Sequence, residues 1–214
     1  MDSTTDKRKT GTTTVGIVTK DAIILGADKR ATAGNYIANK DVTKVIPIND
    51  RMMVTITGVV SDIQQLIKYI RAELKLKDLK TGTDSSVKAV ANLIASFNYS
   101  GLRSQGSIAG FLLAGTDHQG VHLYEISVDG VVMEVKEYES TGSGSPYALA
   151  VIESNYKPTL SEVDAIALAK KAIATAIERD SASGNGYDIF VIGKQGIVHN
   201  CTVVLRGALA DIKN

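Results

Sequence analysis

The chain has 214 residues, of which 44 % are hydrophobic and 22 % charged, and its formal net charge is +1. This length suffices for one sizeable core, and the near-neutral charge gives no electrostatic reason to expect binding to nucleic acid or to an acidic membrane. No run of about 18 apolar residues is present, so no membrane-spanning helix is expected.

Cysteine and histidine are scarce. Cys201 is the only cysteine, so an intramolecular disulfide is impossible, which suits a reducing compartment such as the cytoplasm. The histidines have no metal-ligand spacing with it, so neither a metal nor a cofactor is expected. Residues 1–11 are polar and lack the apolar segment of a secretory signal.

The first half of the chain is predicted to form strands and then two helices. β-branched and apolar residues favour strands at 13–19, 22–28 and 52–58, with a turn at 20–21 that makes the first two a hairpin. Apolar residues at helical spacing predict two helices separated by a loop at 80–86. The first carries Ile63, Leu66, Ile67, Ile70 and Leu74 behind Asp62 as N-cap, and the second carries Val87, Val90, Ile94 and Phe97.

The second half repeats this order. Strands are expected at 107–115, 121–127 and 131–135, with a hairpin turn at Asp129-Gly130, and a helix at 145–156. Ser161 and Asp164 have the form of a capping box, which opens a helix that ends near Arg179. Strands at 188–192 and 196–203 complete the chain. Hairpins connect most strands, so the order predicts an α+β layered sandwich of largely antiparallel sheets with helices on both outer faces.

Two charged residues interrupt apolar strand faces. Asp28 follows Ile24 and Gly26 on one face, and Lys44 shares a face with Ile46 and Ile48. Asp28 could simply be a water-exposed residue at a strand end. A lysine on an apolar face needs a carboxylate partner, so the two could instead pair with each other.

Two short motifs allow two interpretations each. TGSGS at 141–145 suits either a phosphate cradle or a helix-entry turn with a capping serine, and it lacks a complete dinucleotide fingerprint. RDSASGNG at 179–186 suits either a helix C-cap with glycine in a left-handed conformation or a hydrogen-bonding cluster. No G-x-S-x-G motif is present. A hydrolase without a histidine base could instead pair a threonine hydroxyl with an N-terminal amine.

Six stretches together resemble the catalytically active, archaeal-type β subunit of the proteasome core particle. They are GTTTVG at 11–16, ADKRAT at 27–32, the strand of Lys44, the glycine of TITG at 55–58, TGSGSPYA at 141–148 and RDSASG at 179–184. The resemblance extends from Thr12 to the last strands. It implies the Ntn-hydrolase fold, a four-layer α-β-β-α sandwich with two mainly antiparallel sheets, and a threonine-type endopeptidase.

The resemblance also implies that the chain activates itself. Residues 1–11 would be a propeptide cut off autocatalytically between Gly11 and Thr12, and residues 12–214 would form one domain. Gly11 would let the backbone bend sharply there. The freed Thr12 would be the nucleophile, whereas Thr13 and Thr14 would serve as strand residues.

The family's other site residues map onto matching positions. Asp28 and Lys44 would assist proton transfer, with Asp28 keeping Lys44 charged, and Gly58 would supply the oxyanion-hole N–H. Ser143, Asp180 and Ser183 would orient the Thr12 amine and a water. The substrate-binding residues would be Ala31, Thr32, Val42, Ile46, Ile56, Val60 and Gln64. Because these are uncharged and mostly apolar, we expect cleavage after hydrophobic residues, although Ile46, Ile56 and Val60 could be ordinary core residues.

Two segments depart from the family pattern. Thr57, Val59, Val60 and Ser61 surround Gly58 where small residues are usual, which could narrow the substrate groove. Residues 98–110 lack the usual aromatic-proline pattern, so packing between subunits could differ.

The resemblance implies partners as well. These are proteasome α subunits and other β subunits in stacked heptameric α-β-β-α rings, indirectly a regulatory ATPase ring, and unfolded polypeptides as substrates. Two alternatives differ in class: a non-catalytic β subunit, which typically lacks the Gly-Thr junction or the lysine, and a nucleotide-binding module built on TGSGS.

Overall fold

The computed structural model describes residues 11–58, 60–104 and 109–205. Twelve strands and four helices lie in this part of the chain. The strands are β1 (Thr14–Val18), β2 (Ala22–Asp28), β3 (Ala31–Ala33), β4 (Tyr36–Asn39), β5 (Val45–Asn49), β6 (Met52–Gly58), β7 (Ala109–Asp117), β8 (Gly120–Ile126), β9 (Val132–Val135), β10 (Tyr138–Thr141), β11 (Gly186–Gly193) and β12 (Gly196–Val204). The helices are α1 (Val60–Thr81), α2 (Val87–Ser104), α3 (Ser145–Asn155) and α4 (Glu162–Arg179).

The strands form two five-stranded sheets and one hairpin. The first sheet has the order β10-β1-β2-β11-β12, the second has the order β5-β6-β7-β8-β9, and β3 pairs with β4 alone. Every one of these pairs is antiparallel. Short hairpins can make such sheets, whereas parallel pairs would need long crossovers.

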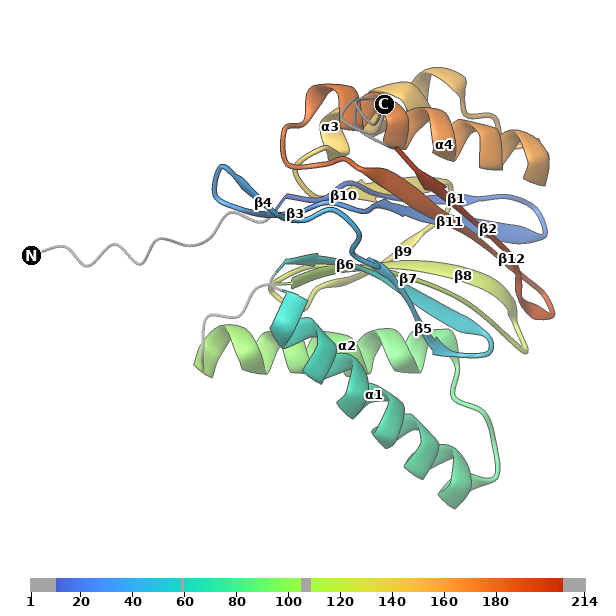
Figure 1. Cartoon of the computed structure of the whole chain (residues 1–214). Coiled ribbons are helices and arrows are strands. Elements are labelled where there is room, and N and C mark those ends of the chain that lie inside the picture. The colour runs from blue at the N-terminus through green and yellow to red at the C-terminus, as the bar shows by residue number, and fades with distance from the viewer. Residues whose placement is uncertain (1–10, 59, 105–108, 206–214) are drawn as a thin grey trace, which may run out of the picture.

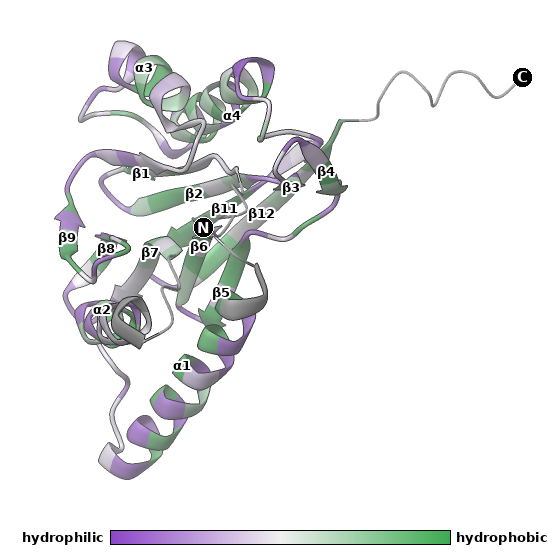
Figure 2. Cartoon of the chain, turned by 90° about the vertical axis from the view of Figure 1, so that its left-hand side faces the viewer, coloured by the Kyte–Doolittle hydropathy of each residue, from purple (hydrophilic) through white to green (hydrophobic). Residues whose placement is uncertain are grey.

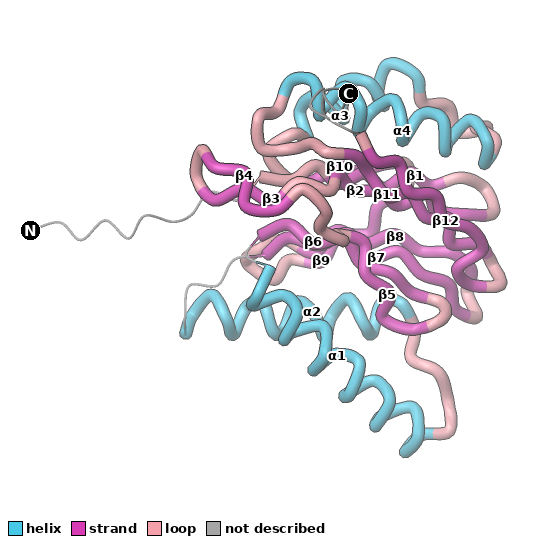
Figure 3. The backbone as a smooth tube through the Cα atoms, viewed as in Figure 1, coloured by secondary structure: helices cyan, strands magenta, loops and turns pink. Residues whose placement is uncertain are grey.

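The sheets stack face to face between two helix pairs, with α3 and α4 outside the first sheet and α1 and α2 outside the second (Figure 1). The same four layers are visible in the backbone trace, where the strands occupy the middle and the helices the outside (Figure 3). The predicted α-β-β-α sandwich is therefore confirmed. The hairpin of β3 and β4 projects from the end of the sandwich at which β1 begins (Figure 1).

Three hydrophobic clusters hold the layers together. One lies between α1, α2 and the second sheet, one between α3, α4 and the first sheet, and one between the sheets. Hydrophobic residues dominate the central strands, while α1 alternates hydrophobic and hydrophilic residues along its length, as one-sided packing requires (Figure 2). The strand alternation accounts for the register: Ile24 of β2 packs toward the helices, whereas Ile23 and Leu25 pack between the sheets.

Most predicted elements are present, with shifted boundaries. Asp62 is not an N-cap, because α1 already begins at Val60. Phe97, which was predicted to lie on the apolar face of the second helix, is 36 % exposed. The neighbouring Asn98 is buried instead, and its side chain donates hydrogen bonds to two backbone carbonyls. The loop predicted at 80–86 is shorter because α1 continues to Thr81.

Several strand predictions also need correction. The strand expected at 107–115 is β7, which runs to Asp117, and residues 107 and 108 lie outside the described residues. β3, β4 and β10 were not predicted. Gly130 has φ +86°, which confirms the hairpin turn before β9, and Ser161 caps α4 by accepting a hydrogen bond from the Asp164 N–H. In the described part of the chain, no helix has the length and apolarity needed to cross a bilayer.

Candidate active site

Thr12 lies directly before β1, where several chain segments meet. β1 lies between β10 and β2, so the loops after β10 and β2 flank Thr12. The backbone there is anchored to β2 because the Asp28 N–H donates to the Thr13 carbonyl over 3.1 Å. Thr12, Thr13 and Thr14 are all buried. The nucleophile predicted from the sequence is therefore enclosed by the fold rather than placed on a flexible surface.

Asp28 and Lys44 form a buried ion pair. The Lys44 Nζ lies 2.7 Å from Asp28 Oδ1, and only 0 % of Asp28 and 3 % of Lys44 is exposed. Asp28 also accepts hydrogen bonds from the N–H groups of Thr13, Arg30 and Gly184, so both carboxylate oxygens are satisfied. The predicted pairing is confirmed, and the alternative of a water-exposed Asp28 is wrong. Lys44 itself lies directly before β5 and not within the strand, where it had been expected.

Lys44 connects this ion pair to the Gly11–Thr12 junction. Its Nζ lies 3.1 Å from Thr12 Oγ1 and 3.3 Å from the Gly11 carbonyl oxygen. Burial lowers the pKa of Lys44, and this outweighs the opposing effect of Asp28, which raises it. The expectation that Asp28 simply keeps Lys44 charged is thus incomplete, because Lys44 gives up a proton more readily than a surface lysine does.

Ser143, Asp180 and Ser183 form a second network on the amide side of Thr12. The Thr12 N–H donates to Ser143 Oγ over 3.2 Å. The hydroxyls of Ser143 and Ser183 both donate to Asp180 Oδ2, over 2.6 and 2.7 Å. For the RDSASGNG motif, the structure therefore shows the hydrogen-bonding cluster as well as the helix end, since Asp180 is also the C-cap of α4.

The glycines of TGSGS bring its backbone against Thr12 and Thr13. Gly142 has φ +98°, and a Cβ there would lie 2.1 Å from the Thr12 carbonyl oxygen. At Gly144 a Cβ would lie 1.9 Å from Thr13 Oγ1. Gly144 is the N-cap of α3 and makes no side-chain cap bond, so the prediction of a capping serine is wrong. The Gly144 N–H donates to the Thr12 carbonyl over 3.3 Å.

Position 11 requires a glycine because the surrounding residues leave no room for a side chain. A Cβ on Gly11 would lie 1.8 Å from the Cβ of Ala182. The Gly11 N–H donates to Thr32 Oγ1 over 3.0 Å, which fixes the residue before the junction.

This geometry suits attack by the Thr12 hydroxyl on the carbonyl that precedes it. Thr12 Oγ1 lies 2.6 Å from the Gly11 carbonyl oxygen. Lys44 contacts both oxygens, so it can accept the hydroxyl proton as a neutral amine or stabilise the developing negative charge as an ammonium. Ser143 contacts the nitrogen that would leave.

Comparison with known proteins gives the family. Residues 8–192 match the model of the proteasome subunit family. The chain is 44 % identical over 190 residues to a proteasome subunit beta of Haloferax volcanii, covering 88 % of this chain and 76 % of that protein. It is 40 % identical over 191 residues to a proteasome subunit beta of Archaeoglobus profundus, covering 89 % of this chain and 88 % of that protein.

A proteasome subunit beta 2 of Staphylothermus marinus is 41 % identical over 199 residues, covering 93 % of this chain and 95 % of that protein. These identities, over nearly whole chains, decide the family. The chain belongs to the proteasome β subunit family.

The structure brings together six of the predicted site residues of this β subunit. Thr12, Asp28, Lys44, Ser143, Asp180 and Ser183 are joined by hydrogen bonds. Gly58 ends β6 with φ +137°, a conformation that favours glycine. Among the described residues, no hydrogen bond joins the Gly58 N–H to the Gly11 carbonyl, whose oxygen accepts from Thr12 and Lys44.

The predicted substrate-binding residues have different surroundings. Thr32 is buried against the junction, Ala31 and Val42 are partly buried, and Gln64 is exposed. Ile56 belongs to the core cluster beneath α1 and α2, and Ile46 packs against it. This matches the alternative that these two are core residues. The side chain of Val60 lies outside the described residues.

Thr57, one of the departures from the family pattern, makes a contact between the sheets. Its Oγ1 lies 3.1 Å from Thr141 Oγ1, which in turn lies 2.7 Å from Thr14 Oγ1. Thr57 precedes Gly58, and Thr141 precedes the TGSGS turn at Gly142. The Thr57 side chain thus connects β6, which ends at the expected oxyanion residue, through β10 to β1, which follows the nucleophile. No sequence motif indicated this contact, because it joins residues 84 positions apart.

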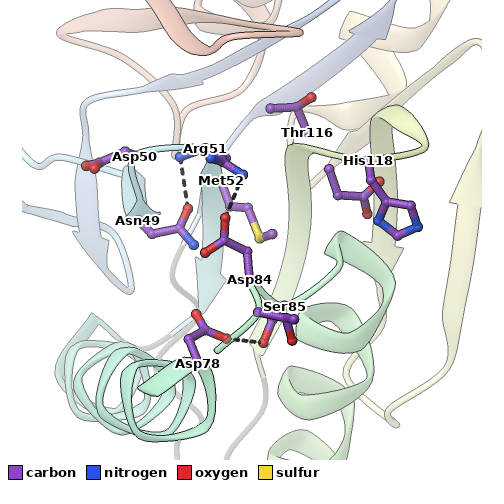
Figure 4. Close-up of a pocket in the computed structure, with 11 residues that line it drawn as sticks. Asn49, Asp50, Arg51, Met52, Asp78, Asp84, Ser85, Thr116 and His118 are labelled. Carbon is purple, nitrogen blue, oxygen red and sulfur yellow. Dashed lines mark hydrogen bonds and ion pairs between the residues drawn. The ribbon is translucent and has the colours of Figure 1, made fainter. Parts of the chain in front are cut away.

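A pocket of about 510 Å³ lies at the opposite end of the sandwich. It is lined by the turns after β5 and β7, the last turns of α1 and the loop that follows it, including Asp78, Asp84 and His118 (Figure 4). Met52 lines it and begins β6, whereas Gly58 ends β6, a separation of about 20 Å at the rise of a strand. The pocket contains no predicted catalytic residue, and the described residues include no group of three potential metal ligands placed to hold an ion.

If Thr12 cleaves the bond that precedes it, the rate of this cleavage should depend on the protonation of Lys44. As pH rises through the pKa of Lys44, its nitrogen becomes able to accept the Thr12 proton, so the rate increases, with a midpoint below the ordinary value of 10.5. Asp28 raises this pKa, so Asp28→Asn should move the midpoint to lower pH. Mass spectrometry of the precursor mixed with its α subunits at a series of pH values measures the conversion, with native gels as the control for assembly. A pH-independent rate, or a shift to higher pH in Asp28→Asn, contradicts this role.

Proposed function

We propose that this β subunit is a threonine endopeptidase that activates itself by cleavage at Gly11-Thr12. The observation that carries the proposal is the contact of Thr12 Oγ1 with both the Gly11 carbonyl oxygen, at 2.6 Å, and the buried Lys44 Nζ, at 3.1 Å. A threonine hydroxyl is a weak nucleophile unless a base accepts its proton. The two contacts support a role for Lys44 as that base and for the Gly11 carbonyl as the group that is attacked.

Self-cleavage would proceed by transfer of the acyl group from nitrogen to oxygen. Thr12 Oγ1 attacks the Gly11 carbonyl carbon, and its proton passes to Lys44. When the Gly11–Thr12 C–N bond breaks, the nitrogen takes up a proton and becomes the α-amine, with Ser143 as the adjacent hydroxyl. Water then hydrolyses the Gly11 ester, which releases residues 1–11 and leaves residues 12–214 as the mature domain.

The same groups would act on peptide substrates. The Thr12 α-amine adds a second base, since α-amino groups have a pKa of about 7.7–8.0. Lys44 and Asp28 remain beside the hydroxyl, and Ser143, Asp180 and Ser183 hold the amine. Gly58 would supply the oxyanion donor once the substrate carbonyl replaces that of Gly11. None of these steps calls for a cofactor or a metal.

The family supports assembly with partner subunits. As a proteasome β subunit, the chain would assemble with α subunits and other β subunits in a core particle, as stacked heptameric rings that a regulatory ATPase ring supplies with unfolded polypeptides. A cytoplasmic location would suit a chain whose single cysteine can form no internal disulfide. The complete set of catalytic residues favours this function over a non-catalytic ring subunit, and the packing of TGSGS against Thr12 and Thr13 argues against a nucleotide-binding module.

Peptide hydrolysis by the assembled particle tests both the activity and the cleavage preference. We expect fluorogenic peptides ending in a hydrophobic residue to be cut faster than matched peptides ending in aspartate or lysine, because the residues proposed to contact that side chain are uncharged. A processed particle that hydrolyses no peptide would overturn the activity. Faster cleavage after charged residues would overturn only the preference.

A further inference from the structure

Thr13 has a hydroxyl that the proposed chemistry does not use, yet it lies in a fully buried polar contact. Its Oγ1 lies 2.7 Å from Ser183 Oγ, and both residues are 0 % exposed. The contact joins residues 170 positions apart, so it is a product of the fold and not of local strand structure. The strand interpretation of Thr13 from the sequence accounts for its backbone but not for this hydroxyl.

The direction of this hydrogen bond follows from the inventory of donors. Ser183 Oγ–H donates to Asp180 Oδ2 over 2.7 Å, and a serine hydroxyl has one proton. Ser183 can therefore only accept from Thr13, whose hydroxyl is the donor. The other Asp180 oxygen accepts from the Ala182 N–H over 3.1 Å, which fixes the carboxylate.

Together with the contacts of Thr12, these hydrogen bonds form a ring around the start of the mature chain. The Thr12 N–H donates to Ser143, and Ser143 donates to Asp180. From the other side, Thr13 donates to Ser183, which donates to the same Asp180 oxygen. Because Thr12 and Thr13 are consecutive, the ring closes through the backbone. Gly144 closes over the Thr13 hydroxyl, where a Cβ would lie at 1.9 Å, so water cannot readily replace this donor.

We propose that Thr13 is a positioning residue. Its hydroxyl holds Ser183, and through it Asp180 and Ser143, in the correct position relative to the Thr12 amine. This inference rests on the proposed threonine-protease function. Without the Thr13 donor, Ser183 loses a hydrogen bond in a buried site and is freer to rotate away from Asp180. The amine would then be held less accurately, and small displacements of reacting groups can cost up to about 100-fold in rate.

Two substitutions separate the hydroxyl from the shape of the side chain. Thr13→Val removes the donor and keeps the branched shape, whereas Thr13→Ser keeps the donor and removes a methyl group. Thr116→Val is a matched control. Thr116 is also buried, and it lies at the far end of β7, whose near end pairs with Gly58. Should Thr13→Val fail to assemble, Thr13→Ala replaces it, because this change adds no atoms.

The assay measures kcat and KM for peptide hydrolysis by particles whose chains begin at Thr12. We expect Thr13→Val to lower kcat by about 10- to 100-fold with KM unchanged, Thr13→Ser to restore most of kcat, and Thr116→Val to match the wild type. A double variant with Ser183→Ala should be no slower than Ser183→Ala alone, because both act through one path.

The possible failures are distinguishable. A wild-type kcat in Thr13→Val, or Thr13→Ser as slow as Thr13→Val, overturns the role of the hydroxyl while leaving the protease function intact. A fully additive double variant shows that Thr13 does not act through Ser183 and overturns the positioning role too. If processed wild-type particles hydrolyse no peptide, the protease function itself fails and the role of Thr13 with it.

Discussion

Replacing Thr12 by alanine is expected to abolish both removal of residues 1–11 and peptide hydrolysis. Its Oγ1 is the hydroxyl placed at 2.6 Å from the Gly11 carbonyl oxygen, and alanine has nothing to attack with. Loss of the nucleophile in another hydrolase lowers kcat by on the order of 10⁶. The measurement is the hydrolysis rate of assembled particles, together with the mass of their β chains.

Thr12→Ser provides the matched control. Serine keeps the hydroxyl and loses only the methyl group, so it should retain processing and measurable hydrolysis. If Thr12→Ala particles assemble and still cut peptides above the uncatalysed rate, another residue supplies the nucleophile. If Thr12→Ser is as inactive as Thr12→Ala, the role of the hydroxyl is not supported.

Replacing Lys44 by methionine should also remove activity, and it should destabilise the fold. Methionine resembles lysine in length but cannot exchange a proton, so the loss of acid–base catalysis alone should slow cleavage by about 10²–10⁴-fold. The change also leaves Asp28 charged and unpaired in a site where it is 0 % exposed. Breaking a buried ion pair typically costs about 3–5 kcal/mol in the free energy of unfolding.

These two effects of Lys44→Met can be measured separately. Chemical denaturation of Lys44→Met beside the wild type should show the destabilisation. The double variant with Asp28→Asn should regain part of the stability and none of the activity, because the unpaired charge is gone but the base is still missing. Lys44→Arg should also be inactive, since arginine keeps its proton. Activity in Lys44→Met would contradict the role of Lys44 in proton transfer.

The layers and the ion pair could be predicted from the sequence because both predictions rest on periodic patterns of apolar residues. Alternation along the strands placed Asp28 and Lys44 on apolar faces, and burial without pairing is too costly for such groups. Short elements lack this information. β10, with the sequence YEST, and the hairpin of β3 and β4 are too brief and polar for alternation to identify them. The N-terminus of α1 was misplaced because Asp62, a good N-cap residue type, lies inside the helix.

The rest of the site depends on contacts between distant residues. Ser143 and Asp180 are 37 positions apart, and neither motif alone indicated that they meet at Thr12. They were found through the resemblance of several motifs together. The Thr13–Ser183 and Thr57–Thr141 contacts were found only in the structure, because a threonine in a strand has the same local pattern whether or not its hydroxyl has a distant partner.

The N-terminus of the β chain in an active, assembled particle tests the central claim most directly. Intact-mass analysis combined with N-terminal sequencing identifies the first residue without assumptions about rate. The account predicts chains that begin at Thr12 in wild-type particles, with residues 1–11 retained in Thr12→Ala. Active particles whose chains still carry residues 1–11 would contradict it, because Thr12 would then have no free amine.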